Sequence, residues 1–346
     1  MMAADAPAPL LRVRGLRVQF GSRAALCDAT FDLFAGETLG LVGESGSGKS
    51  TLARAILRLV RASSGSVEWR GRDLLTCGAA VLRRQRRELQ IIFQDPLASL
   101  NPRMTVGEII AEPLRIFESA LDSRARTERV AAMLLRVGLS TDAIGRYPHE
   151  FSGGQCQRIG IARAMILNPR LLICDEPVSS LDVSIQGQIV NLLLDLQRDA
   201  GTAMLFISHN LAVVRHLSHR ILVMYSGSLV EIAPRDALFD APLHPYTRAL
   251  LAAVPSVPLR QPDAGEAPPT ESAVGAVPAG VPARATPPPE STPAVPSTPE
   301  IGCAFRDRCA YALPVCTLTA PPLEEQAPGH WAACHRSGEF LRLRRS

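Results

Sequence analysis

Lysine is nearly missing from this chain. Of its 37 basic residues, one is Lys, at position 49, and the other 36 are Arg. In a sequence that uses Arg almost everywhere, a lone Lys indicates a position that requires a compact ammonium in place of a planar guanidinium. Position 49 is therefore the first candidate functional residue.

Net charge and aromatic side chains are also scarce. The 346 residues carry a net charge of +4, and 5% of them are aromatic. Neither value favours a nucleic-acid-binding protein, and the basic run at residues 83–87 is interpreted as a solvated helix face. With 47% hydrophobic and 20% charged residues, the composition instead predicts folded domains with well-buried cores.

A long hydrophobic run is missing as well. No stretch approaches the roughly 18 consecutive apolar residues that predict a membrane span. Residues 1–15 lack the apolar segment and the cleavage site of a secretory signal, so we expect the chain in the cytoplasm. In that compartment its eight cysteines remain reduced.

Hydrophobic periodicity predicts an α/β fold. Short strands are expected within residues 11–42 and at 89–93, 171–174, 203–207, 221–225 and 228–232, and helices at 51–59, within 99–139, at 157–166 and at 185–198. Apolar strands that alternate with helices are typical of a buried parallel sheet. The composition then changes: residues 262–299 hold 11 prolines, which predicts a disordered linker.

The segment from Gly43 to Ser50 fits the phosphate-loop pattern G-x-x-x-x-G-K-[ST]. Its glycines let backbone N–H groups turn toward phosphate oxygens, and the helix that follows directs its positive end at the same anion. Lys49 places a charge at the β- and γ-phosphates, and the Ser50 hydroxyl can ligate Mg²⁺. The residues predicted to bind a nucleoside triphosphate are Gly43, Glu44, Ser45, Gly46, Ser47, Gly48, Lys49, Ser50 and Thr51.

Two further patterns point to phosphate chemistry. An apolar strand ends at Asp175 and Glu176, where carboxylates can hold Mg²⁺ and polarise an attacking water; a capped strand end is the alternative. Residues 152–154, Ser-Gly-Gly, precede a helix and offer a second anion-binding geometry, with an ordinary helix cap as the alternative. The chain therefore carries one complete phosphate cradle and one additional half-site.

Six motifs together resemble the ATP-binding cassette family over about residues 11–235. In the family's order they are similar to Walker A, the Q-loop, the signature, Walker B, the D-loop and the switch histidine, and they comprise Gly43–Ser50, Gln94, Ser152–Gln155, Asp175–Glu176, Ser180–Asp182 and His209. The resemblance implies a phosphate-loop NTPase (RecA-like) core with an antiparallel β subdomain and a helical subdomain at about residues 97–168.

The resemblance also implies how ATP is used. Two such domains dimerise head to tail, and the signature of one contacts the ATP held by the other. The implied site residues are, for catalysis, Gln94, Glu176 (the general base) and His209; for Mg²⁺, Ser50, Gln94 and Asp175; for ATP bound by the partner, Ser152, Gly153, Gly154 and Gln155; in the D-loop, Ser180 and Asp182; and for adenine stacking, Phe20. For Phe20, a place in the core is the alternative.

Residues 93–114, 174–193 and 244–255 narrow the resemblance to oligopeptide/dipeptide importer ATPases, whose C-terminal extension would begin at residues 236–261. This implies an ATPase on the cytoplasmic side of the membrane that energises peptide import. Its expected partners are a second, related ATPase chain, two transmembrane permeases and, indirectly, a substrate-binding protein, with no nucleic acid. The alternatives are an importer ATPase for nickel or another small solute, and a soluble cassette ATPase without a transport role.

The predicted C-terminal segment, residues 300–346, contains Cys303, Cys309, Cys316 and Cys334. Their spacing matches neither C-x₂-C zinc sites nor ferredoxins. Three alternatives stay open: a 4Fe–4S cluster, structural zinc, and cysteines without a ligand. The cluster is favoured over zinc because the segment offers only thiolate ligands. The other four cysteines are expected to pack as small apolar residues.

Overall fold

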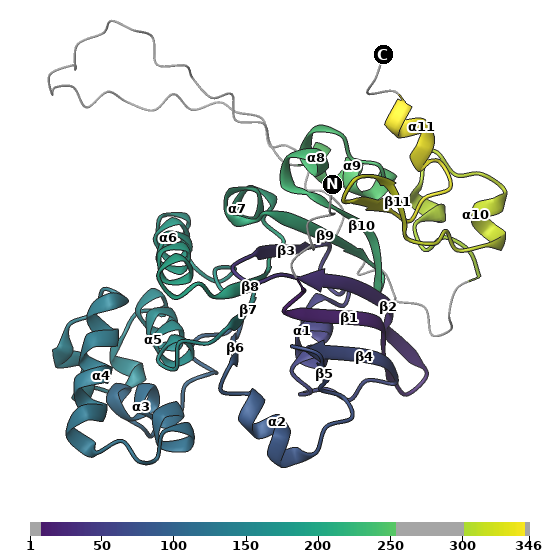
Figure 1. Ribbon diagram of the computed structural model, residues 1–346. Coiled ribbons are helices and arrows are strands. Elements are labelled where there is room, and N and C mark those ends of the chain that lie inside the picture. The colour runs from purple at the N-terminus through teal and green to yellow at the C-terminus, as the bar shows by residue number, and fades with distance from the viewer. Residues whose placement is uncertain (1–7, 254–300, 343–346) are drawn as a thin grey trace, which may run out of the picture.

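The computed structural model describes residues 8–253 and 301–342. The linker predicted at 262–299 lies outside the described residues. In Figure 1, a large sheet lies between a group of helices, α3, α4 and α5, and a small C-terminal segment. Among the described helices, none has the length and apolar character needed to cross a membrane.

The described strands form one twelve-stranded sheet with the order β5-β4-β1-β2-β10-β9-β3-β8-β7-β6, to which β12 and β11 are added beside β10. The strands are β1 (Leu11–Phe20), β2 (Arg23–Leu33), β3 (Thr38–Val42), β4 (Ser64–Trp69), β5 (Arg72–Asp73), β6 (Leu89–Ile92), β7 (Leu171–Asp175), β8 (Ala203–Ile207), β9 (Arg220–Tyr225), β10 (Ser228–Pro234), β11 (Glu324–Ala327) and β12 (His330–Ala332). Strands β9, β3, β8, β7 and β6 pair in parallel, whereas β1, β2, β4 and β5 pair antiparallel. The predicted α/β class, with a parallel core and an antiparallel part, is confirmed.

The helices are α1 (Lys49–Ile56), α2 (Ala79–Gln85), α3 (Val106–Phe117), α4 (Ser123–Arg136), α5 (Gly153–Met165), α6 (Val183–Ala200), α7 (Leu211–Leu217), α8 (Arg235–Asp240), α9 (Pro245–Ala252), α10 (Val315–Leu318) and α11 (Ser337–Arg342), with 3-10 turns η1 (Thr141–Gly145), η2 (Pro148–Glu150) and η3 (Arg306–Arg308). Helix α3 begins with a capping box of Thr105 and Glu108. Helix α6 ends at Gly201, whose φ of 61° suits a residue without Cβ.

The inner parallel strands are buried on both faces. In β7, Leu171 and Ile173 belong to one hydrophobic cluster, while Leu172 and Cys174 belong to the other. Since side chains of a strand alternate between its two faces, a strand covered on both faces is apolar at every position. This explains why β8 and the first four residues of β7 are apolar, and Asp175 ends β7 as its one charged residue.

The antiparallel part of the sheet differs most from the prediction. Strands β1 and β2 have 10 and 11 residues, longer than the short strands expected, and β4, β5, β11 and β12 were not predicted. In β1 the pairing register with β2 shifts between Val13 and Leu16, beside Gly15 at φ 55°. Such a bulge breaks the alternation of side chains, so periodicity underestimates the length of the strand.

The C-terminal segment is joined to the main sheet at a buried carboxylate. Strand β12 pairs with β10, where Glu231 is 0% exposed. Its carboxylate accepts hydrogen bonds from the backbone N–H groups of Leu243 and His244, at 2.7 and 3.0 Å, and lies 2.7 Å from Nε2 of His330. A buried carboxylate requires such partners, so the C-terminal segment completes the structure of the sheet.

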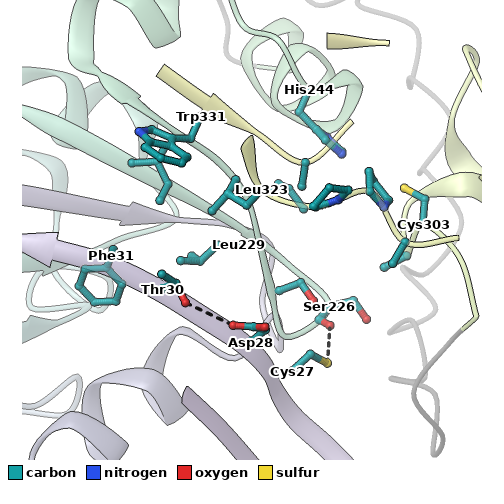
Figure 2. A pocket seen from close by; sticks show the side chains of 18 of the residues that line it. Cys27, Asp28, Thr30, Phe31, Ser226, Leu229, His244, Cys303, Leu323 and Trp331 are labelled. Carbon is teal, nitrogen blue, oxygen red and sulfur yellow. Dashed lines mark hydrogen bonds between the residues drawn. The ribbon is translucent and has the colours of Figure 1, made fainter. Parts of the chain in front are cut away.

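A cavity of about 790 Å³ lies between part of the C-terminal segment and the sheet. Figure 2 shows Phe31 and Leu229 on the sheet side, Leu323 and Trp331 opposite them, and Cys303 at one end. Among the described residues that line this cavity, none belongs to the phosphate loop.

Candidate functional site

The loop from Gly43 to Gly48 connects β3 to α1, which is the strand–loop–helix context that its sequence requires. Two glycines are needed for its path. A Cβ at Gly43 (φ 156°) would lie 2.2 Å from the carbonyl oxygen of Met224, and one at Gly48 (φ 104°) would lie 2.6 Å from that of Ala25. Both residues therefore sit against backbone that cannot move aside as a flexible side chain would.

Lys49 begins α1 and is 4% exposed. Its ammonium donates hydrogen bonds to the carbonyl oxygens of Gly43 (3.0 Å) and Glu44 (2.9 Å). The Nζ atom also lies 3.8 Å from Oε1 of Glu176. Burial lowers the pKa of Lys49, and the carboxylates nearby oppose this effect. The loop thus holds the Lys49 ammonium at the N-terminus of α1. The free backbone N–H groups and the dipole of this helix end also favour an anion, so both features would attract phosphate.

Ser50 and Asp175 bring the two halves of the proposed Mg²⁺ site together. The Ser50 hydroxyl donates a hydrogen bond of 2.7 Å to Oδ1 of Asp175. Asp175 is 0% exposed, and its Oδ2 has no hydrogen-bond partner among the described residues. Burial raises the pKa of Asp175, and the Ser50 bond partly offsets it. A buried carboxylate oxygen without a partner, next to a hydroxyl, fits a hard cation such as Mg²⁺.

The carboxylate of Glu176 lies close to three other predicted site residues, Lys49, Gln94 and His209. Gln94 Nε2 donates a hydrogen bond of 3.3 Å to Oε2 of Glu176, and His209 Nδ1 lies 3.4 Å from the same oxygen. The backbone of Glu176 adopts φ 49°, a left-handed conformation in which a non-glycine residue is strained by about 1–3 kcal/mol. Its N–H donates to the carbonyl oxygen of Ile207 at 3.1 Å, which helps to hold this conformation.

The signature residues lie at the start of α5, apart from the phosphate loop. Ser152 and Gln155 are exposed and form a capping box, with the Ser152 N–H donating to Oε1 of Gln155 at 3.0 Å. The N-cap alternative therefore describes their role within this chain. Among the described residues, no hydrogen bond or ion pair joins the signature to the phosphate loop. A Cβ at Gly154 would lie 2.8 Å from the side chain of Ile185, so a small residue here allows α5 to approach α6.

The remaining predicted site residues are exposed. Ser180 and Asp182 lie between β7 and α6, and Asp182 is the N-cap of α6 without a side-chain cap bond. Phe20 ends β1 and is 53% exposed. This exposure excludes the core alternative for Phe20, while its stacking on adenine stays a prediction.

Two residues near the phosphate loop were missed by sequence reasoning. The hydroxyl of Tyr246, in α9, accepts a hydrogen bond of 2.9 Å from the N–H of Glu44. Arg308, in η3, donates two hydrogen bonds of 2.9 Å to the carboxylate of Glu44. Tyr246 lies within the stretch 244–255 that resembles the importer family, which is the one signal that marked it. Nothing in the sequence around Arg308 relates it to the loop.

The four cysteines of the C-terminal segment line one small cavity together with His244 and Tyr311. Burial raises the pKa of Cys303, and it raises that of Cys334 to about 11, so these two thiols are protonated at neutral pH. Within residues 8–253 and 301–342, no three His, Cys, Asp or Glu side chains are placed to hold a metal ion. Of the other cysteines, Cys156 and Cys174 are buried and Cys27 and Cys77 partly so.

A phosphate loop, a buried carboxylate beside its Ser, and a strained Glu contacted by Gln and His together define the nucleotide site of an ATP-binding cassette ATPase. Comparisons with known proteins agree. The "ABC transporter" family description matches residues 26–179, and "Oligopeptide/dipeptide transporter, C-terminal region" matches residues 230–282 and 267–316. The chain belongs to the ABC transporter family and is an ABC-type ATPase that binds ATP.

Individual relatives are similar over most of the chain. The oligopeptide transport ATP-binding protein OppF of Salmonella typhimurium is 54% identical over 300 residues, which is 87% of this chain and 84% of OppF. The OppF of Haemophilus influenzae is 50% identical over 310 residues, covering 90% of this chain and 88% of OppF. A solved dimeric ATP-binding cassette in a post-hydrolysis state with ADP and Pi has a TM-score of 0.60 and 26% identity, covering 65% of this chain and 98% of its own.

Proposed function

We propose that this chain is the ATP-hydrolysing subunit that energises import of oligopeptides or dipeptides across the cytoplasmic membrane. The observation that carries the proposal is that the nucleotide site and the C-terminal region of the oligopeptide type occur in one chain and contact each other at Glu44. Relatives named for oligopeptide transport, similar over most of their own length, support the same substrate class.

ATP binding would use the loop and the residues at its end. Backbone N–H groups of the loop and the ammonium of Lys49 would bind the β- and γ-phosphates. Ser50, Asp175 and Gln94 would hold Mg²⁺, which when bound neutralises phosphate charge. Phe20, exposed at the end of β1, would stack on adenine.

Hydrolysis would depend on Glu176. Its carboxylate would take a proton from the water that attacks the γ-phosphorus, while the bond from that phosphorus to the bridging oxygen breaks and ADP leaves. Gln94 and His209 both contact Oε2 of Glu176, so they would orient the base and the water.

The expected partners follow from the position of the signature residues, which lie apart from the phosphate loop of their own chain. The signature residues Ser152, Gly153, Gly154 and Gln155, of which Gly154 alone is half-buried, would contact ATP bound by a second ATPase subunit. The D-loop residues Ser180 and Asp182 would lie at the same interface. We infer that the second subunit is a related, different chain, that two transmembrane permeases bind this pair on the cytoplasmic side, and that a substrate-binding protein delivers the peptide to the permeases.

Transport by the reconstituted complex tests the proposal. Proteoliposomes that contain this chain, its cognate second ATPase and the permease pair should accumulate labelled dipeptides or longer peptides when ATP and the binding protein are supplied. A matched complex with Lys49→Ala should not. Accumulation of nickel or another solute without peptide uptake, or ATP hydrolysis without transport, would contradict the assignment to peptides.

For the four cysteines of the C-terminal segment we propose an iron–sulfur cluster. Four thiols line one cavity, and thiolates alone are the ligand set of such clusters. Among the described residues no three of these side chains are placed to hold a metal ion, so the proposal rests on the shared cavity and on the all-thiol ligand set. Ligation would require thiolates, so the raised pKa values of Cys303 and Cys334 would be reversed by the positive charge of the iron atoms.

Anaerobic purification decides between the three alternatives. We expect a coloured protein with about four iron and four sulfide per chain, and loss of both in Cys316→Ser, while Cys77→Ser, outside the cavity, retains them. One zinc per chain, or protein with neither metal, would contradict the cluster.

A further inference from the structure

The C-terminal segment contacts the phosphate loop through the side chain of Arg308. Arg308 donates from Nη1 to Oε2 of Glu44 and from Nη2 to Oε1, each at 2.9 Å, across 264 residues of sequence. A paired contact of this kind orients the carboxylate in addition to neutralising it. Because Glu44 follows the first glycine of the loop, its side chain bears a negative charge at the place that receives a polyanion.

Glu44 is also held by its backbone. Its N–H donates to the Tyr246 hydroxyl at 2.9 Å, and its carbonyl oxygen accepts from the ammonium of Lys49 at 2.9 Å. The carboxylate, the N–H and the carbonyl oxygen of Glu44 therefore all have hydrogen-bond partners. The partner of the carbonyl oxygen is the ammonium of Lys49. Any displacement of Glu44 is transmitted to Lys49 through one peptide group.

The guanidinium of Arg308 packs against two aromatic rings, those of Tyr225 and Phe305. Phe305, three residues earlier, is 4% exposed. Its ring centroid lies 5.2 Å from that of Tyr225 and 5.4 Å from that of Tyr246. The guanidinium of Arg308 lies 5.8 Å from the centroids of Tyr225 and Phe305, within reach of a cation–π attraction. Because these rings restrain the Arg308 side chain, its two hydrogen bonds can in turn restrain Glu44 of the phosphate loop.

We propose that Arg308 is a positioning residue for ATP binding, which acts by orienting and neutralising the carboxylate of Glu44. With Arg308 in place, the loop presents the Lys49 ammonium to the triphosphate. Without it, an uncompensated carboxylate repels the phosphates and the peptide group that Lys49 contacts loses a restraint. This inference rests on the proposed use of the loop as the ATP site.

ATP titration of the purified full chain tests the role of Arg308. In Arg308→Ala the Kd for ATP should rise about 3–5-fold, the upper part of the range expected for losing a partly exposed, two-bond ion pair. Arg308→Lys, which retains the charge but only one bond, should fall between Arg308→Ala and the wild type. In the assembled transporter the KM for ATP should rise in Arg308→Ala while kcat is retained, because the reacting groups are unchanged.

A double-mutant cycle shows whether Arg308 acts through Glu44. Adding Arg308→Ala to Glu44→Gln should change the Kd by less than about twofold, since the charge that Arg308 neutralises is already gone. Arg336→Ala is the matched control, because Arg336 lies in the same segment and pairs with Glu339; its Kd should equal that of the wild type.

Three results would overturn the inference: an unchanged Kd in Arg308→Ala, an equal loss in the wild-type and Glu44→Gln backgrounds, or an equal loss in Arg336→Ala. The last would mean that general loosening of the segment is the cause. If the wild-type chain itself fails to bind ATP, the proposed function fails, and that result is distinct from a failure of the Arg308 role.

Discussion

Glu176→Gln is expected to lower the rate of ATP hydrolysis by about 10²–10⁴-fold while ATP binding is retained. The amide has the shape of the carboxylate but cannot take a proton from water. The neighbouring groups, Gln94 and His209, can still contact the side-chain oxygen. Because bound ATP is then not consumed, ATP-loaded closed dimers should accumulate. Phosphate release by the assembled transporter and the dimer fraction in size-exclusion chromatography measure the two effects.

Glu128→Gln is the matched control for this change. Glu128 lies on α4 with 65% of its side chain exposed and pairs with Arg124, and it is not among the predicted site residues. Its loss should leave hydrolysis at the normal rate. Normal hydrolysis by Glu176→Gln would falsify the assignment of the general base and leave another group to accept the proton.

Lys49→Ala should weaken ATP binding by about 10–100-fold, which corresponds to the loss of a charge-assisted hydrogen bond of about 1.5–3 kcal/mol. Lys49 is 4% exposed, and its ammonium is bonded to two carbonyl oxygens of the loop. Its removal therefore takes a buried, oriented cation out of the loop. Isothermal titration with ATP and Mg²⁺ measures the effect, and a thermal melt shows whether the variant is folded.

Lys49→Arg separates the shape of the cation from its charge. The guanidinium is larger and planar, and it must enter a space bounded by the carbonyl oxygens of Gly43 and Glu44. We therefore expect a loss of affinity close to that of Lys49→Ala. If Lys49→Arg bound ATP as the wild type does, the lone lysine of an otherwise Arg-only chain would have no functional explanation at this position.

The parts of the fold set by local patterns could be predicted from the sequence. Strand β8 and residues 171–174 of β7 are apolar because both faces of the sheet are covered. The phosphate loop is marked by glycines that its backbone path requires. The structure then brings Lys49, Ser50, Gln94, Asp175, Glu176 and His209 together, although they come from four separate parts of the chain.

The parts set by distant contacts could not. Phe20 continues the alternation of Leu16 and Val18, which are 0% and 1% exposed, yet it lies at the hairpin turn and is 53% exposed. Arg308 is one of 36 arginines, and only tertiary structure selects Glu44 as its partner. Signature residues present a different difficulty, because the ATP they would contact belongs to another subunit.

The junction at Glu231 has a consequence for how this chain could have lost or gained its last residues. A gene truncated before β12 would leave a wholly buried carboxylate without His330 and would bare the edge of β10, which invites pairing with other chains. Such a product should aggregate before any defect in transport could be observed. The C-terminal region is therefore part of the folding unit, and shortened forms made for crystallisation or fusion should retain it.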